Sequence, residues 1–274
     1  MKRLIINADD TGAAEGTVEA MEALHAAGVL TSVSPLVNLP DWPKAAAYLR
    51  EHPDLGAGVH LVMNDGKPIL PPAQVPSLVD HQGKFYEGNA LLLRFGRLKM
   101  KELEAEWRAQ VEKFCADTGR QPDHLDLHCQ YPYMISSWFE ASLKVAKAFG
   151  GLPVRLPFDA ALDQKAAQMG RDNGFPGWYI RWAGHGYRRT VSRYGLKSPD
   201  YFESSFSLTN KDNHRTAEYL LGRLDALPEG TTELLGHPGL NAEWRRQDFQ
   251  AMLDPRVRQR IADLGIQLIT FRDL

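Results

Sequence analysis

The sequence has little cysteine, almost no net charge and no long apolar run, and each of these features excludes a class of protein. Its two cysteines, Cys115 and Cys129, form neither a CxxC pair nor a disulfide framework, so we expect a reduced, cytoplasmic compartment. A formal net charge of -2 does not indicate nucleic acid or an anionic membrane surface as a partner. No apolar run approaches the roughly 18 residues that a membrane span needs.

Two further patterns are missing from the start of the chain. The apolar stretch in MKRLIINADD ends in acidic residues too soon for a signal peptide. No GxGxxG follows the first predicted strand, which removes the usual dinucleotide-binding reason for a doubly wound open sheet. What remains is an ordinary globular composition, with 43% apolar and 24% charged residues among 274.

Short apolar runs alternate with helical patterns along the chain. Strands are predicted at 3–8, 31–38, 56–63, 124–129, 152–157, 231–239 and 266–270, and helices at 14–27, 41–52, 99–117, 136–149, 212–226 and 242–263. This order predicts an α/β fold with a largely parallel sheet. Because no linker interrupts it, we expect one domain over residues 1–274, built as a closed or nearly closed (β/α) barrel. A doubly wound open sheet is the alternative.

Two segments depart from the alternation. Residues 64–98 are rich in proline and glycine and are expected to form a long excursion over one end of the sheet, which is typical of a functional lid. Residues 160–210 carry an aromatic and arginine-rich stretch at 178–189. That stretch suits a wall on which a sugar stacks, but it equally suits a packing insert or the surface of a homodimer, since interfaces are enriched in these residues.

The predicted strands carry polar side chains or end in them, and the active sites of parallel α/β folds lie at the carboxyl ends of the strands. They are Asp9, Asp10, His60, Asp126, His128, Arg155 and His237. A single histidine behind a strand is usually structural. Three of them together with an acidic pair form a set suited to a divalent metal ion.

The acidic pair needs compensation if it is buried. Adjacent carboxylates repel each other, and each costs free energy in a partly desolvated place. Either a metal ion or a loop open to water provides that compensation.

Four motifs in this order resemble the YdjC-like carbohydrate deacetylases: NADD, GVHL, HLDLHC and ELLGHPG, over a span from Lys2 to about Leu240. The resemblance implies an irregular (β/α) barrel. It also implies hydrolysis of an N-acetyl group from an acetylated amino sugar, such as a chito-oligosaccharide or a related conjugate. The wider NodB-like polysaccharide deacetylases use a similar Asp, His, His arrangement.

The resemblance also assigns roles. Asp10, His60 and His128 would bind one divalent metal ion, Zn or Mg, while Asp9 would be the general base and His237 the general acid. Such a metal polarises the acetamide carbonyl and lowers the pKa of its bound water from about 15.7 towards 7. A carboxylate then removes the remaining proton, an imidazole protonates the departing amine, and Arg155 is expected to orient the base.

The chain departs from the family pattern at a few positions. Thr11 stands where the family often has Phe, and Gln130 and Tyr131 stand where it often has further histidines, which weakens the case for a second metal. Gln130 and Tyr133 are expected to hydrogen-bond the sugar instead. Cys129 is either a thiolate ligand or a buried inert cysteine.

Two other functions remain open on the sequence. One is a metal-dependent lyase, aldolase or isomerase on a (β/α) barrel, although no lysine or second carboxylate pair stands at a predicted strand end. The other is a sugar-binding relative without activity. In a metal site, His60 or His128 would bind the ion with one ring nitrogen and donate a hydrogen bond from the other, and Asp126 is our candidate for the acceptor.

Overall fold

The centre of the fold is a ten-residue strand, β1 (Lys2–Thr11), seen in a computed structural model that describes residues 1–157, 176–207 and 214–274. Leu4, Ile5 and Ile6 in this strand are buried, although their side chains point alternately to its two faces. Burial on both faces is typical of a parallel strand covered on each side. The predicted first strand is therefore confirmed.

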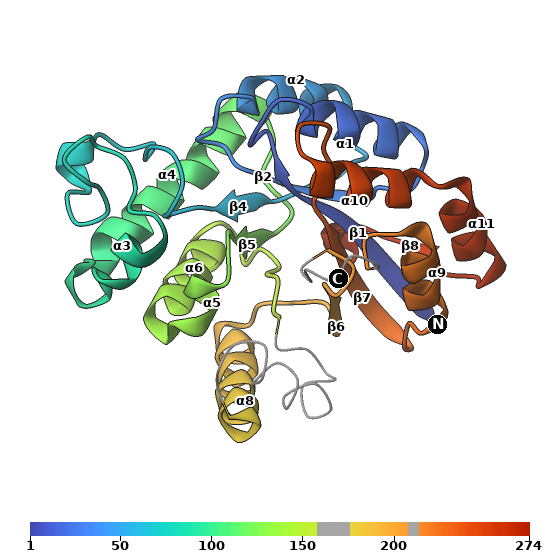
Figure 1. Ribbon diagram of the computed structural model, residues 1–274. Helices are drawn as coiled ribbons and strands as arrows, with labels where there is room; N and C mark the ends of the chain where they lie inside the picture. Colours follow the sequence, from blue (N-terminus) through green and yellow to red (C-terminus); the bar gives the residue numbers. More distant parts are fainter. Residues whose placement is uncertain (158–175, 208–213) are drawn as a thin grey trace.

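The remaining strands pair around β1. They are β2 (Ser32–Pro35), β3 (Gly56–Ala57), β4 (Val59–Leu61), β5 (Leu125–Leu127), β6 (Tyr201–Glu203), β7 (Gly230–Gly236) and β8 (Gln267–Leu268). The larger sheet has the order β3-β2-β1-β7-β6, with β8 beside the first half of β1 (Figure 1). A second sheet contains β4 and β5, and all the ladders in both sheets are parallel.

The predicted strand at 56–63 is split in two at Gly58. A Cβ atom at this position would lie 2.5 Å from the imidazole of His124, so only glycine fits. Gly58 donates its N–H to Val33 of β2, whereas Val59 donates to His124 beside β5. The strand thus changes partner at the glycine, and His60 is delivered to the second sheet.

The predicted strand at 152–157 is reduced to an isolated bridge between Val154 and Leu125. Pro153 and Pro157 flank it, and proline has no N–H to donate to a ladder. Val154 also donates to the carbonyl of Lys197 at 2.9 Å, which leads the chain towards β6. Among the described residues, hydrogen-bonded ladders therefore do not close the barrel, and the fold is an irregular α/β arrangement of mostly parallel strands.

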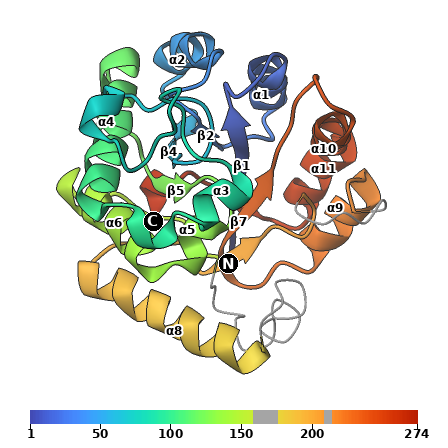
Figure 2. The ribbon, with the colours of Figure 1, turned by 60° about the vertical axis from the view of Figure 1, so that its left-hand side comes forward.

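Helices surround these strands (Figure 2). They are α1 (Thr17–Ala26), α2 (Trp42–Glu51), α3 (Gly88–Leu92), α4 (Met100–Thr118), α5 (Tyr131–Met134), α6 (Ser136–Ala148), α8 (Gly177–Tyr194), α9 (Ala217–Asp225), α10 (Glu243–Leu253) and α11 (Pro255–Asp263). None of the helices in the described ranges has both the length and the apolar character for crossing a membrane. One hydrophobic cluster includes residues from Leu4 to Ile266, but a single domain over the whole chain stays a prediction.

The excursion at 64–98 is anchored to α4 by buried or half-buried acids. The carboxylate of Glu106 accepts the backbone N–H groups of Ile69 and Leu70, at 2.9 and 3.0 Å. Glu102 accepts the N–H of Ser77 at 2.7 Å. The excursion is thus held in place at its start, while its role as a lid stays a prediction. Of the second segment, 160–210, the residues at 160–175 and 208–210 lie outside the described part of the chain.

Candidate active site

Asp9 and Asp10 end β1 on an irregular stretch that turns both side chains towards the same place. Neighbours on a regular strand point to opposite faces. Here the register with β2 passes from Asp9 directly to Thr11, and Asp10 has a positive φ of 60°. As a result, the Nε2 atom of His60 lies 3.7 Å from Asp9 Oδ2 and 3.6 Å from Asp10 Oδ1. Positive φ is costly for a residue other than glycine, and such strain clusters at functional sites.

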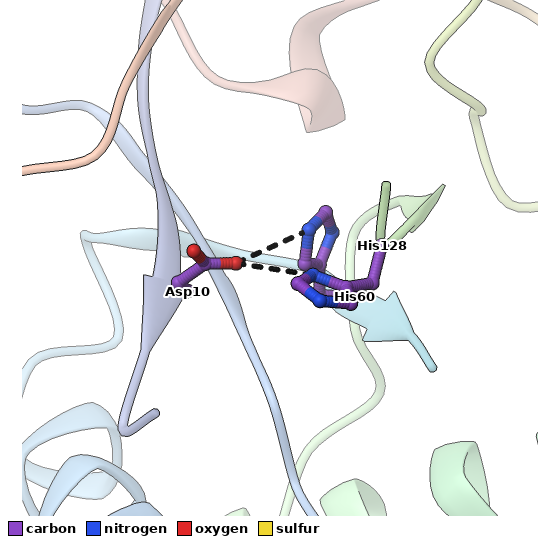
Figure 3. A group of neighbouring side chains, drawn as sticks. All are labelled: Asp10, His60 and His128. Carbon is purple, nitrogen blue, oxygen red and sulfur yellow. Dashed lines mark ion pairs between the residues drawn. The ribbon is translucent and has the colours of Figure 1, made fainter. Parts of the chain in front are cut away.

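Asp10, His60 and His128 form a group of metal-binding geometry (Figure 3). One ligand atom from each lies within 4.8 Å of the others, and Asp10 Oδ1 is 3.3 Å from His128 Nδ1. Asp10 Oδ1 is buried yet has no hydrogen-bond partner among the described residues. Burial raises the pKa of Asp10, but the rings of His128, His237 and His60 lower it, and it lies well below its ordinary value. An ionised oxygen that faces two imidazoles without a hydrogen bond fits a cation between them.

The other oxygen of Asp10 is held by a residue that the sequence did not reveal. Arg245 on α10 donates from Nη2 to Asp10 Oδ2 at 2.7 Å. Gly239 makes this approach feasible, because a Cβ atom there would lie 3.0 Å from Arg245 Cδ. The HPG turn of residues 237–239 therefore leaves room for a guanidinium that directs Oδ1 of Asp10 towards the histidines.

Asp126 holds the second ring nitrogen of His60, as we expected for one of the two histidines. The two residues are direct partners in the β4–β5 ladder, and His60 Nδ1 lies 2.8 Å from Asp126 Oδ1. Burial lowers the pKa of His60, but Asp126, Asp9 and Asp10 raise it above its ordinary value. With Nδ1 bonded to the carboxylate, Nε2 faces the two aspartates.

Arg155 contacts three buried carboxylates next to the site, those of Asp9, Asp126 and Glu233. It donates from Nη1 and Nη2 to the two oxygens of Asp9, each at 2.7 Å, and from Nε to Glu233 at 2.7 Å. Its Nη2 also lies 2.9 Å from Asp126 Oδ2. Asn7 donates to Asp9 Oδ1 at 2.7 Å. Asp9 is therefore an oriented carboxylate, 3% exposed, that lies beside the Asp10–His60–His128 group, and together with His60 and Asp126 it forms a second group of metal-binding geometry.

His237 follows β7 directly and lies next to the end of β1, because Gly236 pairs with Ala8. Its ring Nδ1 is 2.7 Å from Ser207 Oγ, and its backbone N–H donates to Asp248 Oδ2 at 2.9 Å. Burial lowers the pKa of His237, Asp10, Asp9 and Asp248 raise it, and the balance lies below the ordinary value. Neither Ser207 nor Asp248 could be found by motif, since one lies in a loop and the other in a helical pattern.

Of the three residues near His128 for which roles were expected, Tyr133 differs from its expected role. Tyr133 is buried, and its hydroxyl accepts the N–H of Leu127 at 3.0 Å, so its place is in the packing rather than on a sugar. Burial raises the pKa of the Cys129 thiol to about 11, which favours the buried inert cysteine over a thiolate ligand. Gln130 is exposed, and its contact with a sugar stays a prediction.

The aromatic stretch at 178–189 forms part of α8. Trp178 and Trp182 are 69% and 70% exposed, whereas Tyr187 is buried with its ring 4.9 Å from that of Phe139 on α6. The stretch is therefore divided between packing and an exposed surface.

Comparisons with known proteins agree with the motifs. The profile of the YdjC-like protein family matches residues 3–263. A carbohydrate deacetylase of Brevibacillus brevis is 30% identical and a chitooligosaccharide deacetylase of Proteus mirabilis 27% identical; each alignment covers 99% of this chain, with 99% and 98% of the relatives. A crystal structure of an Enterococcus faecalis protein, whose name refers to cellobiose-phosphate cleavage, is similar with a TM-score of 0.78 and 26% identity. That alignment covers 99% of this chain and 98% of the other. The chain thus belongs to the YdjC-like protein family.

Proposed function

We propose that the protein is a metal-dependent hydrolase that removes the N-acetyl group from an acetylated amino sugar. The observation that carries this proposal is the juxtaposition of Asp10, His60 and His128 with a separate, arginine-held carboxylate, Asp9. The names of the relatives, carbohydrate deacetylase and chitooligosaccharide deacetylase, support the reaction and the substrate class.

The donor set fits one divalent ion. Two imidazoles and a carboxylate suit zinc and other divalent first-row transition metals. They suit magnesium less well, because magnesium prefers oxygen ligands. Four buried carboxylates, Asp9, Asp10, Asp126 and Glu233, surround the site. The guanidinium groups of Arg155 and Arg245 pair with them, and the ring nitrogens of His60 and His128 lie 3.6 and 3.3 Å from Asp10 Oδ1, so a divalent cation would fit between this oxygen and the two rings. When bound, this ion supplies polarisation of the acetamide carbonyl and activation of a water molecule.

Asp9 is the residue we assign as general base. The two parallel hydrogen bonds from Arg155 fix the direction of this carboxylate, as a proton acceptor requires. Arg155 is thus a positioning residue for the base.

His237 is the residue we assign as general acid. It comes from β7, level with the end of β1 that carries Asp9 and Asp10. Its lowered pKa makes the imidazolium a good proton donor to a departing amine.

Acetate release from N-acetylglucosamine oligomers, measured with and without a chelator, tests the proposal. We expect release that stops with chelator and returns when Zn or Mg is added back. Release that continues in metal-free protein would contradict metal dependence. Absence of release from acetylated sugars with metal bound would favour a lyase or isomerase, or a binding protein without activity.

We further propose a homodimer and a cytoplasmic location. The homodimer through residues 178–189 is supported by the exposed Trp178 and Trp182 on α8. A solution mass that stays at the 30.7 kDa of one chain at micromolar concentration would contradict it. The cytoplasmic location is supported by the two cysteines, which are free thiols in the structure.

A further inference from the structure

We propose that Ser207 and Asp248 act as positioning residues for His237, and that they fix its imidazole with the proton on Nδ1 and leave Nε2 as the atom that transfers a proton. The reading of Nε2 as a catalytic atom rests on the proposed function. The tautomer itself follows from the hydrogen bonds.

Asp248 is a buried carboxylate whose two oxygens accept hydrogen bonds from three neighbouring residues. It is fully buried, and Arg215 donates to its Oδ1 at 2.6 Å. Its Oδ2 accepts the backbone N–H of His237 at 2.9 Å and the hydroxyl of Ser207. Each of these contacts comes from an N–H or O–H donor, so both oxygens of Asp248 act as acceptors here.

Counting the protons then assigns the ring of His237. A serine hydroxyl has one proton, and at Ser207 that proton is directed to Asp248. The contact of 2.7 Å between Ser207 Oγ and His237 Nδ1 therefore requires a proton on Nδ1, since two acceptors would repel at this distance. Arg215 Nη1 at 3.4 Å from the same Oγ is a further donor to it, which agrees with an oxygen that accepts from the imidazole.

The arrangement does two things for an acid. It orients the ring by two connections to Asp248. The backbone N–H of His237 donates to this carboxylate directly, and the ring Nδ1 reaches it through the hydroxyl of Ser207. It also places Asp248 near the ring. Burial lowers the pKa of His237 and Arg245 of α10 lowers it further, whereas Asp248 raises it together with Asp9 and Asp10 of β1. The remaining nitrogen, Nε2, takes up a proton to form the imidazolium and passes that proton to the departing amine, which returns the ring to the form with its proton on Nδ1.

Ser207→Ala removes the hydroxyl and tests this role. We expect kcat for acetate release from an N-acetylated sugar to fall about tenfold to a hundredfold, with KM, metal content and Tm unchanged. Hydrolysis of 4-nitrophenyl acetate above the buffer rate should stay within about twofold, because a nitrophenolate leaves without a proton. Ser207→Thr keeps the hydroxyl and should restore kcat, and Ser192→Ala, on an exposed position of α8, is the matched control.

An unchanged kcat in Ser207→Ala, or an equal loss on both substrates, would overturn the positioning role. The tautomer has its own measurement, which needs no substrate. Nitrogen-15 NMR of the histidine rings at pH 8, with the His237 signals identified by their loss in His237→Gln, should give a protonated Nδ1 and a bare Nε2. The reverse pattern in the native protein would overturn the inference. If the protein releases no acetate but the ring has its proton on Nδ1, the proposed function has failed and the tautomer stands.

Discussion

Arg155 holds both carboxylate oxygens of Asp9 across 146 residues of sequence, with two hydrogen bonds of 2.7 Å. The same guanidinium contacts Asp126, which in turn holds the ring of His60. One side chain thus links the proposed base to the proposed metal ligands.

Arg155→Met is therefore expected to affect both stability and activity. It leaves Asp9, Asp126 and Glu233 buried without their shared cation, which costs about 3–5 kcal/mol of unfolding free energy. Urea denaturation measures this loss. Arg258→Met, on an exposed position of α11, should change stability by less than about 0.5 kcal/mol. Equal stability of the two variants would show that the network contributes nothing.

Arg245→Gln is expected to weaken metal binding. Without the guanidinium on Oδ2, the Asp10 carboxylate can rotate, and loss of such supporting contacts lowers metal affinity by about 10- to 100-fold. Titration of metal into the chelator-treated protein measures the affinity. Arg245→Lys retains a cation near Oδ2 and should lose less, and Arg246→Gln beside it should lose nothing. An Arg245→Gln variant with native affinity would rule out the positioning of Asp10 by this residue.

His124 gives the stability a pH dependence. It is fully buried between Asp123 and Asp126, and although burial lowers its pKa, these two acids raise it to about 9. Against an unfolded value of about 6.5, the charged ring stabilises the fold fully below about pH 6.5, and this contribution is lost as the pH rises through 9. The difference amounts to about 3 kcal/mol.

Urea unfolding of chelator-treated protein between pH 6.5 and 10 checks this dependence. His124→Gln should have lower stability at pH 6.5 and a flatter profile, whereas His81→Gln, in an exposed position, should follow the native curve. A native protein equally stable at pH 6.5 and 10 would mean that His124 is neutral in the fold.

The strand ends were readable from the sequence, but the residues that support them were not. Asp9 and Asp10 follow an apolar run, while His60 and His128 lie in predicted strands, and parallel strands bring their carboxyl ends to one edge. Arg245 and Asp248 lie within a helical pattern, where a charged residue is ordinarily a solvated one. Their approach to Asp10 and His237 depends on the packing of α10 against the strands, which no local pattern contains.

The break at Gly58 illustrates the same limit. Its neighbours continue a strand pattern, and the reason for the break is the ring of His124, 66 residues further along the chain. The short bridge at Val154 was easier to foresee, since two prolines in six residues weaken any ladder. Positive φ at Asp10 was not visible in advance, although it explains how two adjacent carboxylates serve one site.

Metal content measured beside acetate release in Asp9→Asn and Asp10→Asn tests the central claim most directly, with Tm recorded to exclude misfolding. Asp10→Asn should lose metal, because an amide is a weak neutral ligand. Asp9→Asn should keep metal and lose activity by about 10²–10⁴-fold, and His237→Ala should do the same, since each lacks a proton-transferring group. If Asp9→Asn loses metal as readily as Asp10→Asn, both aspartates are ligands, and if it retains metal and near-native activity, Asp9 is not the base.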